Sequence, residues 1–243
     1  MNALNLVTTS KVCQVNITKA KGLMLTAALL GALVAPSRSL SADSSAGGSV
    51  STEQTGLIVG TVAGRTPQHT VVYLSGVQGQ FKPPAEPIEL DQKNKTFIPH
   101  VLPVLKGTIV RFANSDFSPD GTGLSHNVKF VKYGGSRTLV MRERTRNLTN
   151  FMVWPDRPKD AKTIRPGKVA LLCNIHPEME GYVIVLDNPY FTVADAGGKF
   201  ELEAPEGSYT LKAWHPRYEK REFEQEVIVT PGGKTEANIQ LKK

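Results

Sequence analysis

Short apolar runs recur along most of this chain, and Gly, Pro, Asn and Asp separate them. No window beyond residue 56 has a convincing helical period, whereas GLIVGTVAG (56–64) and TVVYLSG (70–76) have the length and composition of β-strands. The other runs that we expect to form strands are 87–92, 96–104, 108–115, 126–133, 137–143, 168–173, 181–187, 199–204, 208–216, 222–230 and 236–242. Strands at this spacing predict an all-β fold of the sandwich or barrel type.

The N-terminal region predicts export. Residues 22–35, GLMLTAALLGALVA, are apolar; Lys19 and Lys21 precede them, and small residues follow. This layout is typical of a secretory signal peptide over 1–42, with cleavage near Ser41 or Ala42. Residues 43–55 then form a flexible polar lead-in. Because the apolar run is shorter than the roughly 20 residues that span a bilayer, we expect an exported, periplasmic protein without a membrane span.

The charge of the chain argues against nucleic acid as a partner. The formal charge is +7, but residues 1–42 contain basic residues and no acidic ones, which leaves a mature chain of about +3. Basic residues are nevertheless concentrated over 129–168. Such a segment is either a solvated surface or a docking face for an acidic partner.

The cysteines constrain the chemistry. Cys13 lies within the predicted signal peptide, so the mature protein retains Cys173 alone. One thiol cannot form an internal disulfide, and a free thiol in an oxidising compartment is prone to reaction. Cys173 is therefore either a buried small apolar residue or a sulfur that is held by a ligand.

Two different modules share the predicted strands. The C-terminal part contains DAGGKFEL, PEGSYTLKA and VTPGGKTEANIQL, which resemble the carboxypeptidase regulatory-like (transthyretin-like) β-sandwich. The first strands of that family resemble the two runs at 56–76, far upstream. We therefore expect a discontinuous sandwich over 56–80 plus 189–243, with a second β-domain over 81–188 inserted in it or joined to it.

The segment 81–188 contains a GTIVRFANS strand, then HNVKF, and finally CNIHPEM between two strands. This order resembles the cupredoxins, the blue-copper family of Greek-key β-sandwiches, including amicyanin and the plastocyanin-like methylamine-utilisation proteins. The resemblance implies a copper site formed by His126, Cys173, His176 and Met179. It also implies that Asn127 ties the two ligand loops together through its side chain.

The residue types agree with this resemblance. A thiolate and a thioether are soft donors, and two imidazoles with one thiolate and a weak thioether are the ligands of a type 1 copper centre. Zinc prefers further Cys or His to a thioether. The alternative is that Cys173 is packed in the core, Met179 fills a gap and the histidines are incidental. His100 and His215 are more readily explained as structural residues than as metal ligands.

The predicted function is one-electron transfer between redox partners, such as an acidic cytochrome or dehydrogenase. No hydrolytic or phosphate-binding motif is present, and five histidines are few for a second, catalytic copper centre, so we expect no enzymatic activity. Two alternatives remain: a copper-binding protein for storage, delivery or resistance, and a structural β-sandwich protein with a vestigial loop. The loop before His126 is longer than in small cupredoxins and is expected to cover part of the site or to face a partner.

Overall fold

The computed structural model describes residues 54–132, 141–143, 149–218 and 221–242. The predicted signal peptide, most of the lead-in, Cys13 and part of the basic segment therefore lie outside the described residues. Among the described residues, no helix is long and apolar enough to cross a membrane.

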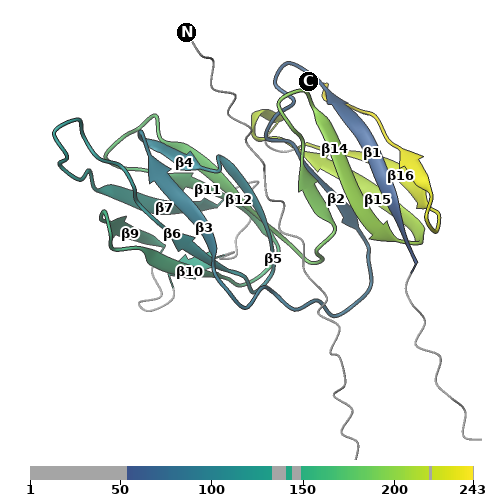
Figure 1. Cartoon of the computed structure of the whole chain (residues 1–243), viewed down its shortest axis with the longest axis horizontal. Coiled ribbons are helices and arrows are strands. Elements are labelled where there is room, and N and C mark those ends of the chain that lie inside the picture. Colours follow the sequence, from purple (N-terminus) through teal and green to yellow (C-terminus); the bar gives the residue numbers. More distant parts are fainter. Residues whose placement is uncertain (1–53, 133–140, 144–148, 219–220, 243) are drawn as a thin grey trace, which may run out of the picture. The chain divides into compact units, whose positions relative to one another are not determined.

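The prediction of an all-β chain is confirmed (Figure 1). The first strands are β1 (Thr55–Ala63), β2 (Val71–Ser75), β3 (Ile88–Lys93), β4 (Thr96–Ile98), β5 (Val101–Leu105), β6 (Ile109–Phe112), β7 (His126–Lys132), β8 (Met141–Glu143) and β9 (Asn150–Val153). They are followed by β10 (Lys159–Thr163), β11 (Gly167–Leu172), β12 (Glu180–Leu186), β13 (Phe191–Val193), β14 (Lys199–Pro205), β15 (Gly207–Trp214), the 3-10 turn η1 (Pro216–Tyr218), β16 (Glu222–Val229), β17 (Lys234–Glu236) and β18 (Ile239–Gln240).

The differences from the sequence prediction lie in short strands. β9, β10 and β13 were not predicted, because each is only three to five residues long. The single run expected over 96–104 forms two strands, β4 and β5, which are separated by a cis peptide bond between Ile98 and Pro99. The two strands belong to different sheets.

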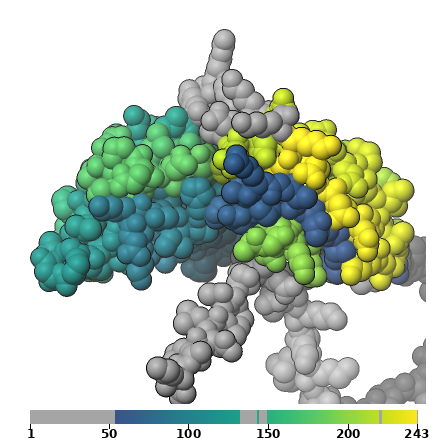
Figure 2. Space-filling model, turned by 90° about the horizontal axis from the view of Figure 1, so that it is seen from above, coloured from purple at the N-terminus to yellow at the C-terminus, as the bar shows by residue number. Residues whose placement is uncertain are grey.

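Four sheets divide the strands into two sets. Residues 88–186 supply two five-stranded sheets, with the orders β4-β3-β6-β10-β8 and β5-β12-β11-β7-β9. The flanking residues supply two four-stranded sheets: β14-β1-β17, to which β18 adds by pairing with β1, and β13-β2-β15-β16. β1 pairs antiparallel with β14 and parallel with β17, which joins chain segments far apart in sequence. Figure 2 shows the blue surface of the early strands directly beside the yellow surface of the last residues, as the pairing of β1 with β17 and β18 requires.

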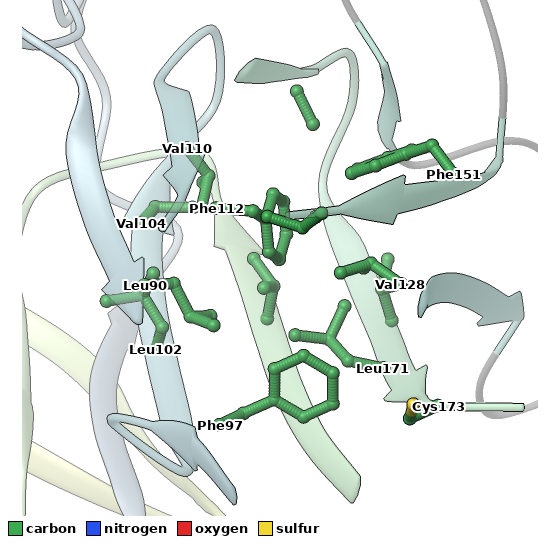
Figure 3. Close-up of a cluster of buried hydrophobic side chains, with 14 of the residues drawn as sticks. Leu90, Phe97, Leu102, Val104, Val110, Phe112, Val128, Phe151, Leu171 and Cys173 are labelled. Atoms are coloured by element: carbon green, nitrogen blue, oxygen red, sulfur yellow. The ribbon is translucent and has the colours of Figure 1, made fainter. Parts of the chain in front are cut away.

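Alternating burial explains why each pair of sheets forms a sandwich. β14, for example, alternates exposed and buried residues along its length, which is the pattern of a strand with one face in a core. One apolar core lies among the strands of 88–186 and includes Leu90, Phe97, Phe112 and Leu171 (Figure 3). A second core gathers residues of the flanking strands, among them Ile58, Leu74 and Leu211.

The first core ends at the candidate site. Figure 3 shows Cys173 at the end of a strand, beyond Leu171 and below Val128. Cys173 and Met179 are both members of this core, and they are 4% and 1% exposed. The fold therefore places the sulfur atoms of the loop 173–179 at the edge of a packed sandwich rather than in solvent.

Candidate metal centre

β7 and β11 bring the predicted ligands together. They pair antiparallel, with Ala170 opposite Val131 and Leu172 opposite Lys129, so that the end of β11 runs toward the start of β7. His126 is the first residue of β7, and Cys173 directly follows β11. Residues separated by 47 positions in the chain thus meet at one end of one sheet.

Backbone hydrogen bonds shape the loop between β11 and β12. The Cys173 amide donates to the Met179 carbonyl at 3.2 Å, and the Met179 amide donates to the His176 carbonyl at 3.0 Å. The antiparallel pairing of the two strands continues into the loop through the first of these bonds. The short spacing between Cys173, His176 and Met179 is therefore the spacing that a closed turn between adjacent strands requires.

Three donor atoms converge. The Nδ1 atoms of His126 and His176 are 3.1 Å apart, and the Cys173 Sγ lies 3.8 Å from the His176 Nδ1. The ligand atoms of the three residues all lie within 4.8 Å of one another, and this is the one such cluster of His, Cys, Asp and Glu found among the described residues. Cys173 is a buried free cysteine, and the His126 side chain is fully buried.

These distances fit a common metal ion. With bonds of about 2.0 Å to nitrogen and about 2.3 Å to sulfur, as in zinc sites, tetrahedral angles place two nitrogens about 3.3 Å apart and a nitrogen and a sulfur about 3.5 Å apart. The separations of 3.1 Å and 3.8 Å lie close to these values. The Met179 side chain, which carries a soft thioether, is buried in the same core as Cys173.

Asn127 bridges the two strands of the site. Its amide donates to the Cys173 Sγ at 3.5 Å, and its side-chain Oδ1 accepts from the Asn174 amide at 3.4 Å. Its Nδ2 donates to the Phe151 carbonyl at 3.3 Å and to the Asn150 side chain. Asn127 thus contacts the Cys173 thiol, the loop 173–179 (the ligand loop) and the neighbouring strand β9.

Sequence reasoning did not identify Asp116. Its Oδ2 lies 2.8 Å from the His126 Nε2, and both side chains are almost fully buried. The sequence signal for Asp116 was weak, because it lies in the long loop after β6, where Asp120 is an equally plausible partner for a histidine. Only the folded loop distinguishes them: Asp116 is 3% exposed, whereas Asp120 is exposed and bonds within its own turn.

The environment lowers the pKa values of two residues at the site, Asp116 and His176. Burial would raise the pKa of Asp116, but hydrogen bonds from the Lys95 amide and the His126 ring outweigh it and lower that pKa. Burial and the neighbouring His126 lower the pKa of His176. Both directions favour the forms that a metal site needs, which are an ionised carboxylate and a neutral imidazole.

The other histidines lie outside this cluster. His215 uses both ring nitrogens: Nε2 pairs with the Gln68 carbonyl at 3.1 Å, and Nδ1 accepts from the Arg217 amide at 3.0 Å. His100 stacks edge-on against His69, with ring centroids 4.9 Å apart. Neither His100 nor His215 belongs to the group with His126, Cys173 and His176.

Comparisons with known proteins give structural likeness only. No protein-family model matches the chain, and no curated protein matches it. Among solved structures, an oxidised proline-to-alanine mutant of amicyanin matches at 21% identity and a TM-score of 0.31, covering 41% of this chain and 82% of that one. A reduced tryptophan-to-tyrosine mutant of amicyanin matches at 19% identity and a TM-score of 0.33, covering 47% and 98%. A purple cupredoxin from Nitrosopumilus maritimus matches at 17% identity and a TM-score of 0.32, covering 41% and 99%.

Proposed function

We propose that this chain is an exported type 1 copper protein that carries single electrons between redox partners. The observation that carries the proposal is the buried convergence of two imidazole Nδ1 atoms with a free thiol, at separations that suit one metal ion. His126, Cys173 and His176 would hold the ion, and Met179 would supply a weak thioether ligand. A bound copper ion supplies a one-electron couple.

The protein's own residues hold the donors in place. The ring of His126 is fixed on β7, while the backbone bonds of Cys173 and Met179 close the loop. Because packed strands and hydrogen bonds set these positions, the donors need to move little when the charge of the ion changes. The apolar core around Cys173 and Met179 also excludes water from the sulfur atoms.

His176 offers the route for the electron. It is partly exposed, whereas His126, Cys173 and Met179 are buried. Its neighbour Ile175 is 47% exposed, so an apolar surface adjoins the ligand that reaches solvent. A redox protein would dock against this surface, and the basic residues within 129–168 favour an acidic partner such as a cytochrome or dehydrogenase.

The domain assignment remains part of the proposal. We infer a cupredoxin domain over 81–188 and a carboxypeptidase regulatory-like sandwich over 56–80 plus 189–243. The division of the sheets supports this, because strands β3 to β12 pair only with one another among the described pairings. Export after cleavage near residues 41–42 is likewise proposed. N-terminal sequencing of the protein purified from its host would test it: a mature chain that begins at residue 1 would contradict export.

The experiment for the copper centre is a visible spectrum after addition of Cu(II), beside the Cys173→Ser variant. We expect an intense thiolate-to-copper charge-transfer band that reductant bleaches reversibly and that is absent from Cys173→Ser. His100→Ala is the matched control, because it removes an imidazole outside the cluster and should leave the band unchanged. A colourless wild-type Cu(II) complex would contradict the type 1 assignment.

Copper storage or delivery would use the same residues, and a structural protein with a vestigial loop would bind copper weakly. Exchange kinetics separate storage from electron transfer. An electron carrier should release Cu(I) slowly to a chelator and accept an electron rapidly from a small reductant. Rapid release with slow reduction would favour storage or delivery.

A further inference from the structure

Asp116 and His126 form a buried hydrogen-bonded pair behind the donor cluster. The two ring nitrogens of His126 have different partners: Nδ1 faces His176, and Nε2 lies 2.8 Å from the Asp116 carboxylate. The side chains of His126 and Asp116 are 0% and 4% exposed. Because an ionised carboxylate only accepts hydrogen bonds, the ring proton resides on Nε2 and the Nδ1 lone pair points toward the cluster.

The carboxylate is held independently of His126. The Lys95 amide donates to the same Oδ2 at 2.8 Å, and the Asp116 amide donates to the Asn114 Oδ1 at 3.0 Å. The Leu124 amide donates to the Asp116 carbonyl at 2.9 Å, which closes the loop before β7. Asp116 is therefore placed by the Lys95 and Leu124 amides and by the Asn114 side chain, and His126 meets a fixed acceptor.

The hydrogen bond to His126 does not by itself explain why a charged residue is buried at position 116. A neutral amide or a backbone carbonyl would accept the same Nε2–H bond with less desolvation cost. An acidic residue adds a full negative charge one imidazole away from the donor cluster. Such carboxylate–histidine pairs strengthen a metal-bound imidazole and fix its orientation.

We propose that Asp116 is a positioning residue that lowers the reduction potential of the centre by favouring Cu(II) over Cu(I). This inference rests on the proposed copper site. One electron reduces Cu(II) to Cu(I), with no bond formed or broken and no proton taken up. The thiolate and the carboxylate together balance the two charges of Cu(II), whereas Cu(I) leaves the buried group with one net negative charge. In a low-dielectric site the neutral group is the more stable one.

The test is the reduction potential of the copper-loaded full chain and of Asp116→Asn, measured by spectroelectrochemistry. Asn keeps the shape and the acceptor oxygen but removes the charge. We expect the ratio of Cu(I) to Cu(II) affinity to rise tenfold or more, which is a potential increase of at least about 59 mV for one electron. Asp120→Asn is the matched control, because Asp120 lies in the same loop, is exposed and bonds only within its turn, so its ratio should change less than threefold.

Three results would separate the possible failures. The role of the charge is overturned, with the copper site left intact, if the reduction potential of Asp116→Asn equals that of Asp120→Asn. It is also overturned if that potential falls below the wild-type value. A wild-type protein with no charge-transfer band overturns the proposed function instead. If Asp116→Asn does not fold, nitrogen-15 NMR of metal-free wild type decides the positioning role: a His126 proton on Nδ1 rather than Nε2 overturns it.

Discussion

At the scale of single residues, the site depends on side chains that join segments distant in sequence. Asn127 contacts the thiol of Cys173 through its amide, and its side chain bonds the ligand loop and β9. Asn114 has a similar role on the other side of His126. Its Nδ2 donates to the Leu124 and Val153 carbonyls at 2.8 and 2.9 Å, which ties the loop before β7 to the end of β9.

Asn127→Ala should weaken copper retention more than it weakens folding. Removal of the side chain frees the Asn174 amide and the ligand loop, so we expect a roughly tenfold faster loss of copper to a chelator and a destabilisation of about 1–3 kcal/mol. Stopped-flow chelation and denaturant unfolding measure the two effects. Asn174→Ala is the control, since it retains the backbone N–H that Asn127 accepts. An equal loss of copper from both variants would contradict the bridging role.

Asn114→Ala should reduce stability even without metal. It leaves the Leu124 and Val153 carbonyls without their Asn114 partner, at a cost of about 1–3 kcal/mol for the buried groups. Urea unfolding of metal-free wild type and variant measures it. Unchanged stability would mean that water replaces the amide at both carbonyls.

At the scale of elements, β12 is packed too closely at its start to accept a side chain. A Cβ on Gly181 would lie 2.8 Å from the Phe97 Cβ, and Phe97 is itself fully buried in the core. This close approach lets β12 begin at Glu180, the residue that directly follows Met179.

Gly181→Ala should therefore destabilise the sandwich of strands β3 to β12 by about 1–3 kcal/mol, because Phe97 has to move within a packed core. Thermal and urea unfolding measure the change. Gly197→Ala is the control: its Cβ would meet only the Asp195 Oδ1, at an ordinary 3.4 Å, and its φ is not positive. A larger loss for Gly197→Ala would contradict the packing argument.

At the scale of the whole molecule, a third buried cluster contains residues from both sets of strands, including Tyr73, Tyr182, Ile184 and Trp214. Beside it Glu222 accepts from Lys168 at 2.5 Å and from the Tyr73 hydroxyl. Burial would raise the pKa of Glu222, but the hydrogen bonds from Lys168 and Tyr73 outweigh it and lower that pKa below its ordinary value. Burial and Glu222 raise the pKa of Tyr73.

The hydrogen bonds of Glu222 with Lys168 and Tyr73 predict that the stability difference between wild type and a Glu222 variant depends on pH. A lowered folded-state pKa means that Glu222 stabilises the fold above its unfolded-state pKa, and that this contribution is lost as the pH falls through the folded-state value. Glu222→Gln should therefore be less stable than wild type at pH 7, and the difference should shrink below about pH 4. Urea unfolding of both proteins at several pH values measures it. A difference that grows toward acid would contradict the assignment.

The sequence alone determined the secondary structure class and the chemical identity of the donors. Short alternating runs can bury one face only as strands, so the all-β fold follows from local pattern. The Cys173 thiol with His and Met on the same strand turn limits the chemistry to a few classes. The predicted copper, its four ligands and the domain boundaries remain proposals. The sequence resemblance predicted that 56–80 and 189–243 belong to one sandwich, but the pairing of β1 with β14 and β17 in particular required the folded chain.

The tertiary structure decided what surrounds the donors. Asp116 and Asp120 are equivalent acids in one loop of the sequence, yet only Asp116 is buried against the His126 Nε2. Likewise, nothing local marks Asn114 as the residue that holds β9 to that loop. The chemical type of each donor is a property of a single residue and can be read directly from the sequence. Their distances, burial and hydrogen-bond partners depend on which strands pair, and long-range packing alone fixes that.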